Sequence, residues 1–150
     1  PDKNWSIRNL SKNKNITMEI INENPNYDWD FDYLSQNQSI SIKDVIENIN
    51  EDWNFASLSE NKNIDWNDVE NNPNLFWSID NLSRNSNINK EILFDNNLDW
   101  DIDNLSSNEN IDLDFIHDNN ELEWNWNKIN YNSFNKSKQR FIEALKNEES

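Results

Sequence analysis

A tryptophan returns at an almost constant interval along most of this chain, with spacings of 24, 24, 24, 23 and 24 residues. The residues in this register are Trp5, Trp29, Trp53, Trp77, Trp100 and Trp124. A fixed period of this length is typical of repeat proteins, in which each repeat buries its apolar face only against its neighbours. The sequence therefore predicts an array over residues 1–132, with repeats that start near residues 4, 28, 52, 76, 99 and 123.

Other residue types recur at fixed distances from each tryptophan. In the third repeat these are Leu58, Ser59, Asn61 and Ile64, which lie five, six, eight and eleven residues after Trp53. We interpret the recurrent leucine, isoleucine and tryptophan as core between repeats. The recurrent serine and asparagine are expected to form ladders, in which their side chains hydrogen-bond to the backbone of a neighbouring repeat.

Each repeat is predicted to form two short helices. The first should run from the tryptophan to the asparagine eight residues later, capped by the aspartate just before the tryptophan, as at Asp28, Asp52 and Asp99. Candidate caps of the second helix are Thr17, Ser41, Asp65, Asn89 and Asp112. Because the chain contains no glycine, the asparagines that end the second helices are expected to adopt the left-handed conformation. These are Asn24, Asn48, Asn72, Asn96 and Asn119.

These patterns predict an all-α fold, a short α-solenoid of about six two-helix repeats of 24 residues. The alternative is a leucine-rich-repeat-like β/α solenoid, whose period also includes 24 residues. That alternative needs an apolar residue two positions after the repeated leucine, where this chain has polar or charged side chains such as Lys12, Glu60 and Arg84. Residues 133–150 lack the repeat and are expected to form an amphipathic capping helix that covers the end of the array.

The motif Trp-x-[Ile/Phe]-x-x-Leu-Ser-x-Asn-x-Asn-Ile, with Asn-Pro-Asn at 24–26 and 72–74, carries a resemblance. It resembles the Trp- and Asn-rich short repeats in proteins of giant nucleocytoplasmic DNA viruses, the Mimivirus-like group among them. The resemblance covers roughly residues 1–132, with Ile49 in place of the proline in one copy. It implies a viral protein located inside the host cell, in the cytoplasm, the viral factory or the virion, and it does not identify a biochemical function.

The composition argues against several functions. The net charge of −16 is opposite to what binding to nucleic-acid phosphates requires, and no apolar run is long enough to span a membrane. Cysteine is absent and His117 is the single histidine. The segments 28–32 and 99–103 imitate the start of a calcium loop but lack its glycine and its final glutamate. We therefore expect neither an enzyme nor a bound metal or cofactor.

Binding is instead expected at positions that vary between the repeats. The predicted partner-binding residues are Asp30, Asp32, Tyr33, Asp80, Asp101 and Asp103. Asp32, Asp80 and Asp103 share one register and should align as an acidic stripe. The leading hypothesis is a scaffold that binds a protein with a basic or polar surface. The alternatives are an acidic decoy that mimics nucleic-acid charge, a structural component of a virion or viral factory, and a stripe that only keeps the protein soluble.

Overall fold

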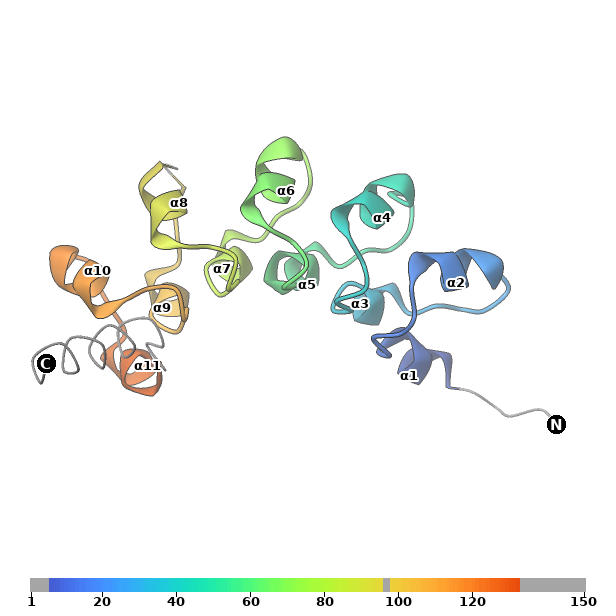
Figure 1. The fold of residues 1–150 in the computed structure, drawn as a ribbon, viewed down its shortest axis with the longest axis horizontal. Helices are drawn as coiled ribbons and strands as arrows, with labels where there is room; N and C mark the ends of the chain where they lie inside the picture. Colours follow the sequence, from blue (N-terminus) through green and yellow to red (C-terminus); the bar gives the residue numbers. More distant parts are fainter. Residues whose placement is uncertain (1–5, 96–97, 133–150) are drawn as a thin grey trace, which may run out of the picture. The chain divides into compact units, whose positions relative to one another are not determined.

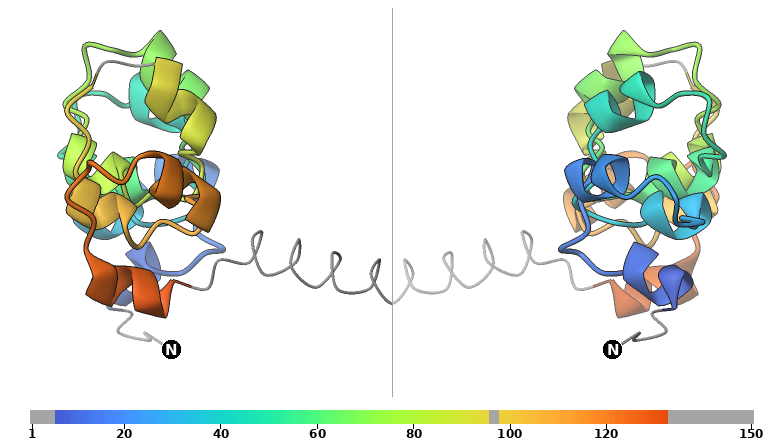
Figure 2. Two further views of the ribbon diagram at one scale, coloured as in Figure 1. Left: turned by 90° about the vertical axis from the view of Figure 1, so that its left-hand side faces the viewer. Right: turned by 90° about the vertical axis from the view of Figure 1, so that its right-hand side faces the viewer.

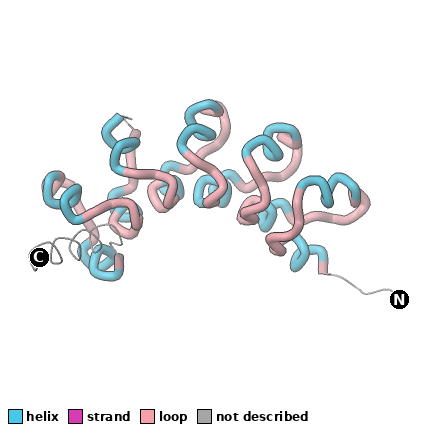
Figure 3. The backbone as a smooth tube through the Cα atoms, viewed as in Figure 1, coloured by secondary structure: helices cyan, strands magenta, loops and turns pink. Residues whose placement is uncertain are grey.

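The described part of the chain is helical. The computed structural model describes residues 6–95 and 98–132, with only the backbone described for residues 94 and 95. Within these ranges the backbone forms helices and loops and no strand (Figure 3). The predicted all-α class is therefore confirmed, and the leucine-rich alternative is wrong because it requires a strand in every repeat.

The chain divides into two compact units, Pro1–Ser78 and Ile79–Ser150, which we call unit 1 and unit 2. The helices of unit 1 are α1 (Ile7–Ser11), α2 (Met18–Glu23), α3 (Phe31–Leu34), α4 (Ile42–Glu47), α5 (Phe55–Glu60) and α6 (Trp66–Asn71). Those of unit 2 are α7 (Ile79–Leu82), α8 (Lys90–Asp95), α9 (Ile102–Leu105), α10 (Leu113–Asp118) and α11 (Trp126–Tyr131).

The helices of each unit lie in two rows. In unit 1, α1, α3 and α5 form the first row and α2, α4 and α6 the second row, so that each repeat contributes one helix to each row (Figure 1). In unit 2, α7, α9 and α11 form the first row, and α8 and α10 the second row. The right-hand view of Figure 2 shows α1 and α2 of unit 1, in blue, as two separate helices joined by a loop.

The first helix of each repeat begins later than the sequence predicted. In the repeats with Trp29, Trp53, Trp100 and Trp124, the tryptophan lies in the loop before the helix, and the residue after it is the N-cap. Asp30 accepts a hydrogen bond from the Tyr33 amide at 3.2 Å, and Asp101 accepts one from the Asn104 amide at 2.9 Å. The prediction that Asp28, Asp52 and Asp99 are the caps is therefore wrong. The reason is that the backbone amide of the tryptophan donates to the carbonyl two residues earlier, as from Trp29 to Tyr27 and from Trp100 to Leu98, both at 3.0 Å, so the tryptophan belongs to the loop.

The second helix of each repeat begins where the sequence predicted. Ser41 and Asp65 form capping boxes, in which the cap side chain accepts a bond from the N3 amide and the N3 aspartate accepts one from the cap amide. Asp112 and Asn89 accept the amide three residues later, at 2.8 and 3.2 Å. Thr17 is the N-cap of α2 without a side-chain bond.

The described asparagines that end the second helices do not adopt the predicted left-handed conformation, since φ is negative at Asn24, Asn48, Asn72 and Asn119. Asn96, the fifth of the predicted set, lies outside the described residues. Asn48 has φ −122°, and its side-chain amide donates to the Asp44 carbonyl at 2.8 Å. Its own carbonyl accepts the indole N–H of Trp53 at 2.8 Å. The same pair of bonds recurs at Asn24 with Trp29, Asn72 with Trp77, and Asn119 with Trp124. Because the amide satisfies a carbonyl at the helix end, no positive φ is needed there.

Successive repeats are joined by the predicted serine and asparagine ladders. The Ser35 hydroxyl donates to Phe31 O at 2.7 Å and accepts the backbone amide of Asn54, in the next repeat, at 2.9 Å. The buried Asn61 side chain donates to Ser35 O and Asn37 O of the preceding repeat at 3.0 and 3.1 Å. Equivalent bonds occur in unit 2, where Ser83 accepts from Asp101 and Asn108 donates to Ser83. The ladder prediction is confirmed within each unit.

The tryptophans in the repeat register differ in burial. Trp53 and Trp124 are buried, while Trp29, Trp77 and Trp100 are half-buried at the edge of the core. Outside the register, Trp126 is 62% exposed, although it takes the place of an apolar residue of other repeats. Trp5 and the predicted capping helix at 133–150 lie outside the described residues.

Candidate interaction surface

The six predicted partner-binding residues lie at the starts of first-row helices. Asp30, Asp32 and Tyr33 belong to the start of α3 in unit 1, and Asp80, Asp101 and Asp103 to α7 and α9 in unit 2.

Two of these residues have a structural task. Asp30 and Asp101 are helix N-caps, and both residues are partly buried. The Asp101 carboxylate also accepts the Asn104 side-chain amide at 2.8 Å. Carboxylates that accept backbone amides are held in one position, so these two present a fixed negative charge at the edge of the surface.

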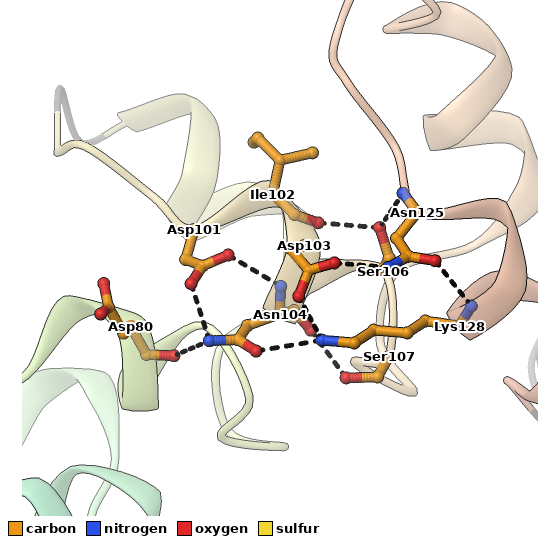
Figure 4. A network of polar contacts seen from close by, with 9 residues as sticks. All are labelled: Asp80, Asp101, Ile102, Asp103, Asn104, Ser106, Ser107, Asn125 and Lys128. Atoms are coloured by element: carbon orange, nitrogen blue, oxygen red, sulfur yellow. Dashed lines mark hydrogen bonds and ion pairs between the residues drawn. The ribbon is translucent and has the colours of Figure 1, made fainter.

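The aspartates of the predicted stripe are exposed. Asp32 accepts the Asn54 side-chain amide of the next repeat at 2.9 Å. The Asp80 carboxylate points away from the polar network of unit 2, and only its backbone carbonyl takes part, as an acceptor from Asn104 at 3.0 Å (Figure 4). Asp32 and Asp80 therefore offer carboxylate oxygens that solvent or a partner can reach.

Asp103 is already paired with a cation from the following repeat. Lys128 Nζ and the Asn125 amide both donate to its carboxylate, and Lys128 Nζ also contacts Asn104 Oδ1 at 3.3 Å (Figure 4). These donors, Lys128 first and Asn125 second, lower the pKa of Asp103 below its usual value. The ionised form of Asp103 is therefore favoured in the fold.

The pKa of Asp103 gives a direct test of this pairing. Replacing Lys128 by methionine is expected to raise the Asp103 pKa toward its ordinary value, because the strongest donor is lost. The measurement is a carboxyl-carbon NMR titration. Because the folded-state pKa is lowered, the stability contribution of the pair is present above the unfolded pKa and is lost as pH falls through the folded one. A Lys43→Met control, which removes the exposed ion pair with Glu47, should leave Asp103 unchanged.

The part of the surface beside α1 carries cations as well as carboxylates. Arg8 Nε lies 3.8 Å from an Asp30 carboxylate oxygen, and its guanidinium carbon lies 4.9 Å from the centre of the Tyr33 ring. Lys12 Nζ lies 3.9 Å from the same ring centre. Tyr33 is thus in contact with two cations of the preceding repeat.

An open groove of about 720 Å³ lies in unit 1, next to this cation-aromatic cluster. Trp29, Phe31 and Ile7 supply its apolar lining. Four aspartates and Arg8 also line it: Asp28, Asp30, Asp32 and Asp52 are the aspartates. An apolar floor bordered by carboxylates suits the aliphatic stem and charged head of a lysine or arginine.

The surface contains cations as well as the predicted aspartates. Arg8 occupies the same register as Asp32, three residues after its tryptophan, and Lys128 occupies the register of Tyr33. The register of the predicted stripe therefore contains a positive charge at Arg8 as well as the three aspartates. The pairing of these cations across repeats follows from the ladder geometry, which the sequence alone does not give.

Other sequence candidates for chemistry are not assembled into a site. His117 is exposed and lies 3.4 Å from Asp118, its neighbour in the chain. Among residues 6–95 and 98–132, no group of three or more acidic, histidine or cysteine side chains is placed to hold a metal ion. In the same ranges, no helix has the length and hydropathy needed to cross a membrane.

The chain matches no known protein family, no curated protein and no solved structure.

Proposed function

We propose that this chain is a non-catalytic repeat protein, built as a short α-solenoid, that acts as a scaffold for protein–protein interaction. The observation that carries the proposal is that the recurrent positions and the variable positions of the repeat have different roles. The recurrent tryptophan, leucine, serine and asparagine are used in the core and in hydrogen bonds between repeats. The positions that vary are left for solvent and partners. On α3, α7 and α9 they include the exposed carboxylates of Asp32, Asp80 and Asp103.

The partner we propose is a protein with basic side chains. The surface already holds cations in the chain's own contacts, since Arg8 is bound by Asp30 and Tyr33, and Lys128 by Asp103 and Asn104. A lysine or arginine of a partner would meet the same chemistry at Asp32 and Asp80. We propose no direct contact with nucleic acid and no membrane association. Location inside an infected cell or in a virion rests on the resemblance to giant-virus repeats.

The second candidate function is that of an acidic decoy for nucleic-acid-binding proteins. The observation that favours it is charge, since 29 acidic residues stand against 13 basic ones. Salt separates the two functions. A decoy that replaces a phosphate backbone should lose its partner steeply as ionic strength rises, whereas a scaffold with shaped contacts should lose less. A structural role in a virion or viral factory would instead require self-assembly of the purified chain.

Charge reversal tests the scaffold proposal. The double variant Asp32→Lys and Asp80→Lys is expected to lose the captured basic partner in affinity purification from the cells that make the protein. Attraction becomes repulsion at both positions, while stability changes by no more than about 0.5 kcal/mol because both side chains are exposed.

The matched control is Glu23→Lys with Glu70→Lys, two exposed glutamates of second-row helices. It changes the net charge equally and should retain the partner. If both double variants retain the partner equally, the acidic stripe serves only to keep the protein in solution. If both lose it equally, net charge alone drives binding, as the decoy function requires.

A further inference from the structure

We propose that an apolar groove in unit 2 receives a large apolar side chain from a protein segment whose neighbouring residues are basic. This inference rests on the proposed scaffold function and adds an anchor site to it. The groove has a volume of about 340 Å³. Its apolar lining comes from Leu93, Leu98, Trp100, Ile102, Phe115 and Leu122.

The floor of the groove belongs to the hydrophobic core of unit 2. Phe115 is buried in that core, and Leu93, Trp100, Ile102 and Leu122 pack against it while remaining partly accessible. Leu98, at the rim, is 40% exposed. Concave sites lined by partly accessible apolar side chains with few polar groups are where proteins bind apolar ligands and anchors.

The comparison with unit 1 indicates that this lining is not dictated by the repeat. Unit 1 has a groove of about 310 Å³ at the corresponding place, beside Trp29. There, the position two residues before the tryptophan is held by Tyr27 and Glu51, where the groove of unit 2 has Leu98 and Leu122. The remaining described repeat has Leu75 at this position. Since the repeat accepts tyrosine and glutamate at this position, its packing does not require a leucine at both places that line the groove of unit 2.

The charge around the groove identifies the kind of partner. Asp99 lines it, and the exposed Glu121 and Glu123 flank Leu122 in the chain. Carboxylates around an apolar site favour a segment whose apolar residue stands between lysines or arginines, and disfavour an acidic one. The groove is therefore complementary to a basic protein segment with an apolar anchor.

Two synthetic peptides test the proposal. One is a fluorescein-labelled peptide of lysine and serine, and the other is the same peptide with its two central serines replaced by leucine. The charges are identical, so a difference in affinity reports the apolar anchor alone. The leucine peptide is expected to bind the wild-type chain about tenfold more tightly in fluorescence anisotropy, because it buries apolar surface that the serine peptide lacks.

Variants locate the effect. Leu98→Asp places a charge at the rim and should remove the tenfold preference while leaving the weak binding of the serine peptide. The matched control is Tyr27→Asp, the same register position in unit 1, which should keep the preference. Leu122→Ser provides a second variant in the groove, and circular dichroism at the binding temperature checks that each variant is folded.

Three results would overturn the proposal. The first is equal binding of both peptides by the wild-type chain, which would mean that charge alone acts and that the scaffold function survives without this anchor site. The second is a preference that persists in both Leu98→Asp and Leu122→Ser, which would place the anchor elsewhere. The third is self-association in sedimentation that Leu98→Asp abolishes, which would mean that a second copy of the chain occupies the groove.

Discussion

Replacing Trp53 by alanine is expected to lower the free energy of unfolding by about 3–5 kcal/mol. Trp53 is 7% exposed, and its ring packs edge-on against Phe31 with 4.9 Å between ring centres. Its indole N–H also satisfies the carbonyl of Asn48. Alanine would leave a cavity and an unsatisfied carbonyl at a helix end. Urea denaturation followed by circular dichroism measures the change.

Trp126→Ala is the matched control, because it removes the same side chain from a position that is 62% exposed. Its effect is expected to stay within about 1 kcal/mol, since most of the ring already contacts solvent. An equal loss in both variants would show that burial does not determine the effect. Intact stability in Trp53→Ala together with lost partner binding would mean that Trp53 contacts a ligand and is not core.

Asn61→Asp is expected to be almost as damaging, at about 3 kcal/mol near neutral pH. In the native chain, the Asn61 amide donates hydrogen bonds to Ser35 O and Asn37 O. The change to aspartate is nearly isosteric, but it replaces these N–H donors with a carboxylate oxygen that faces the same two carbonyl oxygens. The site is buried, so water cannot screen the repulsion. Thermal or urea unfolding as a function of pH measures the effect.

The pH dependence of Asn61→Asp has a definite sign. Burial next to carbonyl oxygens raises the folded-state pKa of the new carboxyl above its unfolded value of about 3.9. Below that value both states are protonated and the loss is smallest. It grows as pH rises, because the unfolded state ionises more readily than the folded one.

Asn13→Asp is the control for this variant, since Asn13 occupies the same register but is exposed. Its side-chain oxygen accepts the Asn15 amide, a bond that aspartate can keep. We expect a change within about 0.5 kcal/mol and little dependence on pH. A large effect at Asn13, or none at Asn61, would contradict the assignment of the buried amide as a link between repeats.

The local chemistry of the second helices could be predicted from sequence because it is contiguous. Ser41 and Asp44 stand three residues apart, and a capping box needs only that spacing. The start of the first helix could not be predicted in the same way. Whether Asp28 or Asp30 caps α3 depends on Trp29, whose indole is held by Asn24 in the loop. Both aspartates fit a cap by residue type, and the tryptophan bond decides between them.

The candidate residues at the starts of α3, α7 and α9 could be chosen from sequence because these positions vary between the repeats. The ion pairs that they form could not be predicted in this way. The pairing of Lys128 with Asp103 joins residues 25 apart in different repeats. It depends on how far one repeat is displaced from the next, which the sequence pattern does not specify. The prediction of left-handed asparagines was wrong for a related reason. A hydrogen bond from the asparagine side chain to a carbonyl took the place of the expected backbone turn.

The ladder bonds within each unit all run in one direction. Asn61 donates back to the repeat before it, and Ser35 accepts from the repeat after it, as do their counterparts Asn108 and Ser83. The junctions that these bonds join within each unit are therefore head-to-tail and share the same serine and asparagine chemistry. A gene that gains or loses one complete copy by unequal recombination would recreate the same junction on both sides of the change. Chains of this kind can thus be expected to vary in length by whole copies, with no compensating mutation at the new boundary.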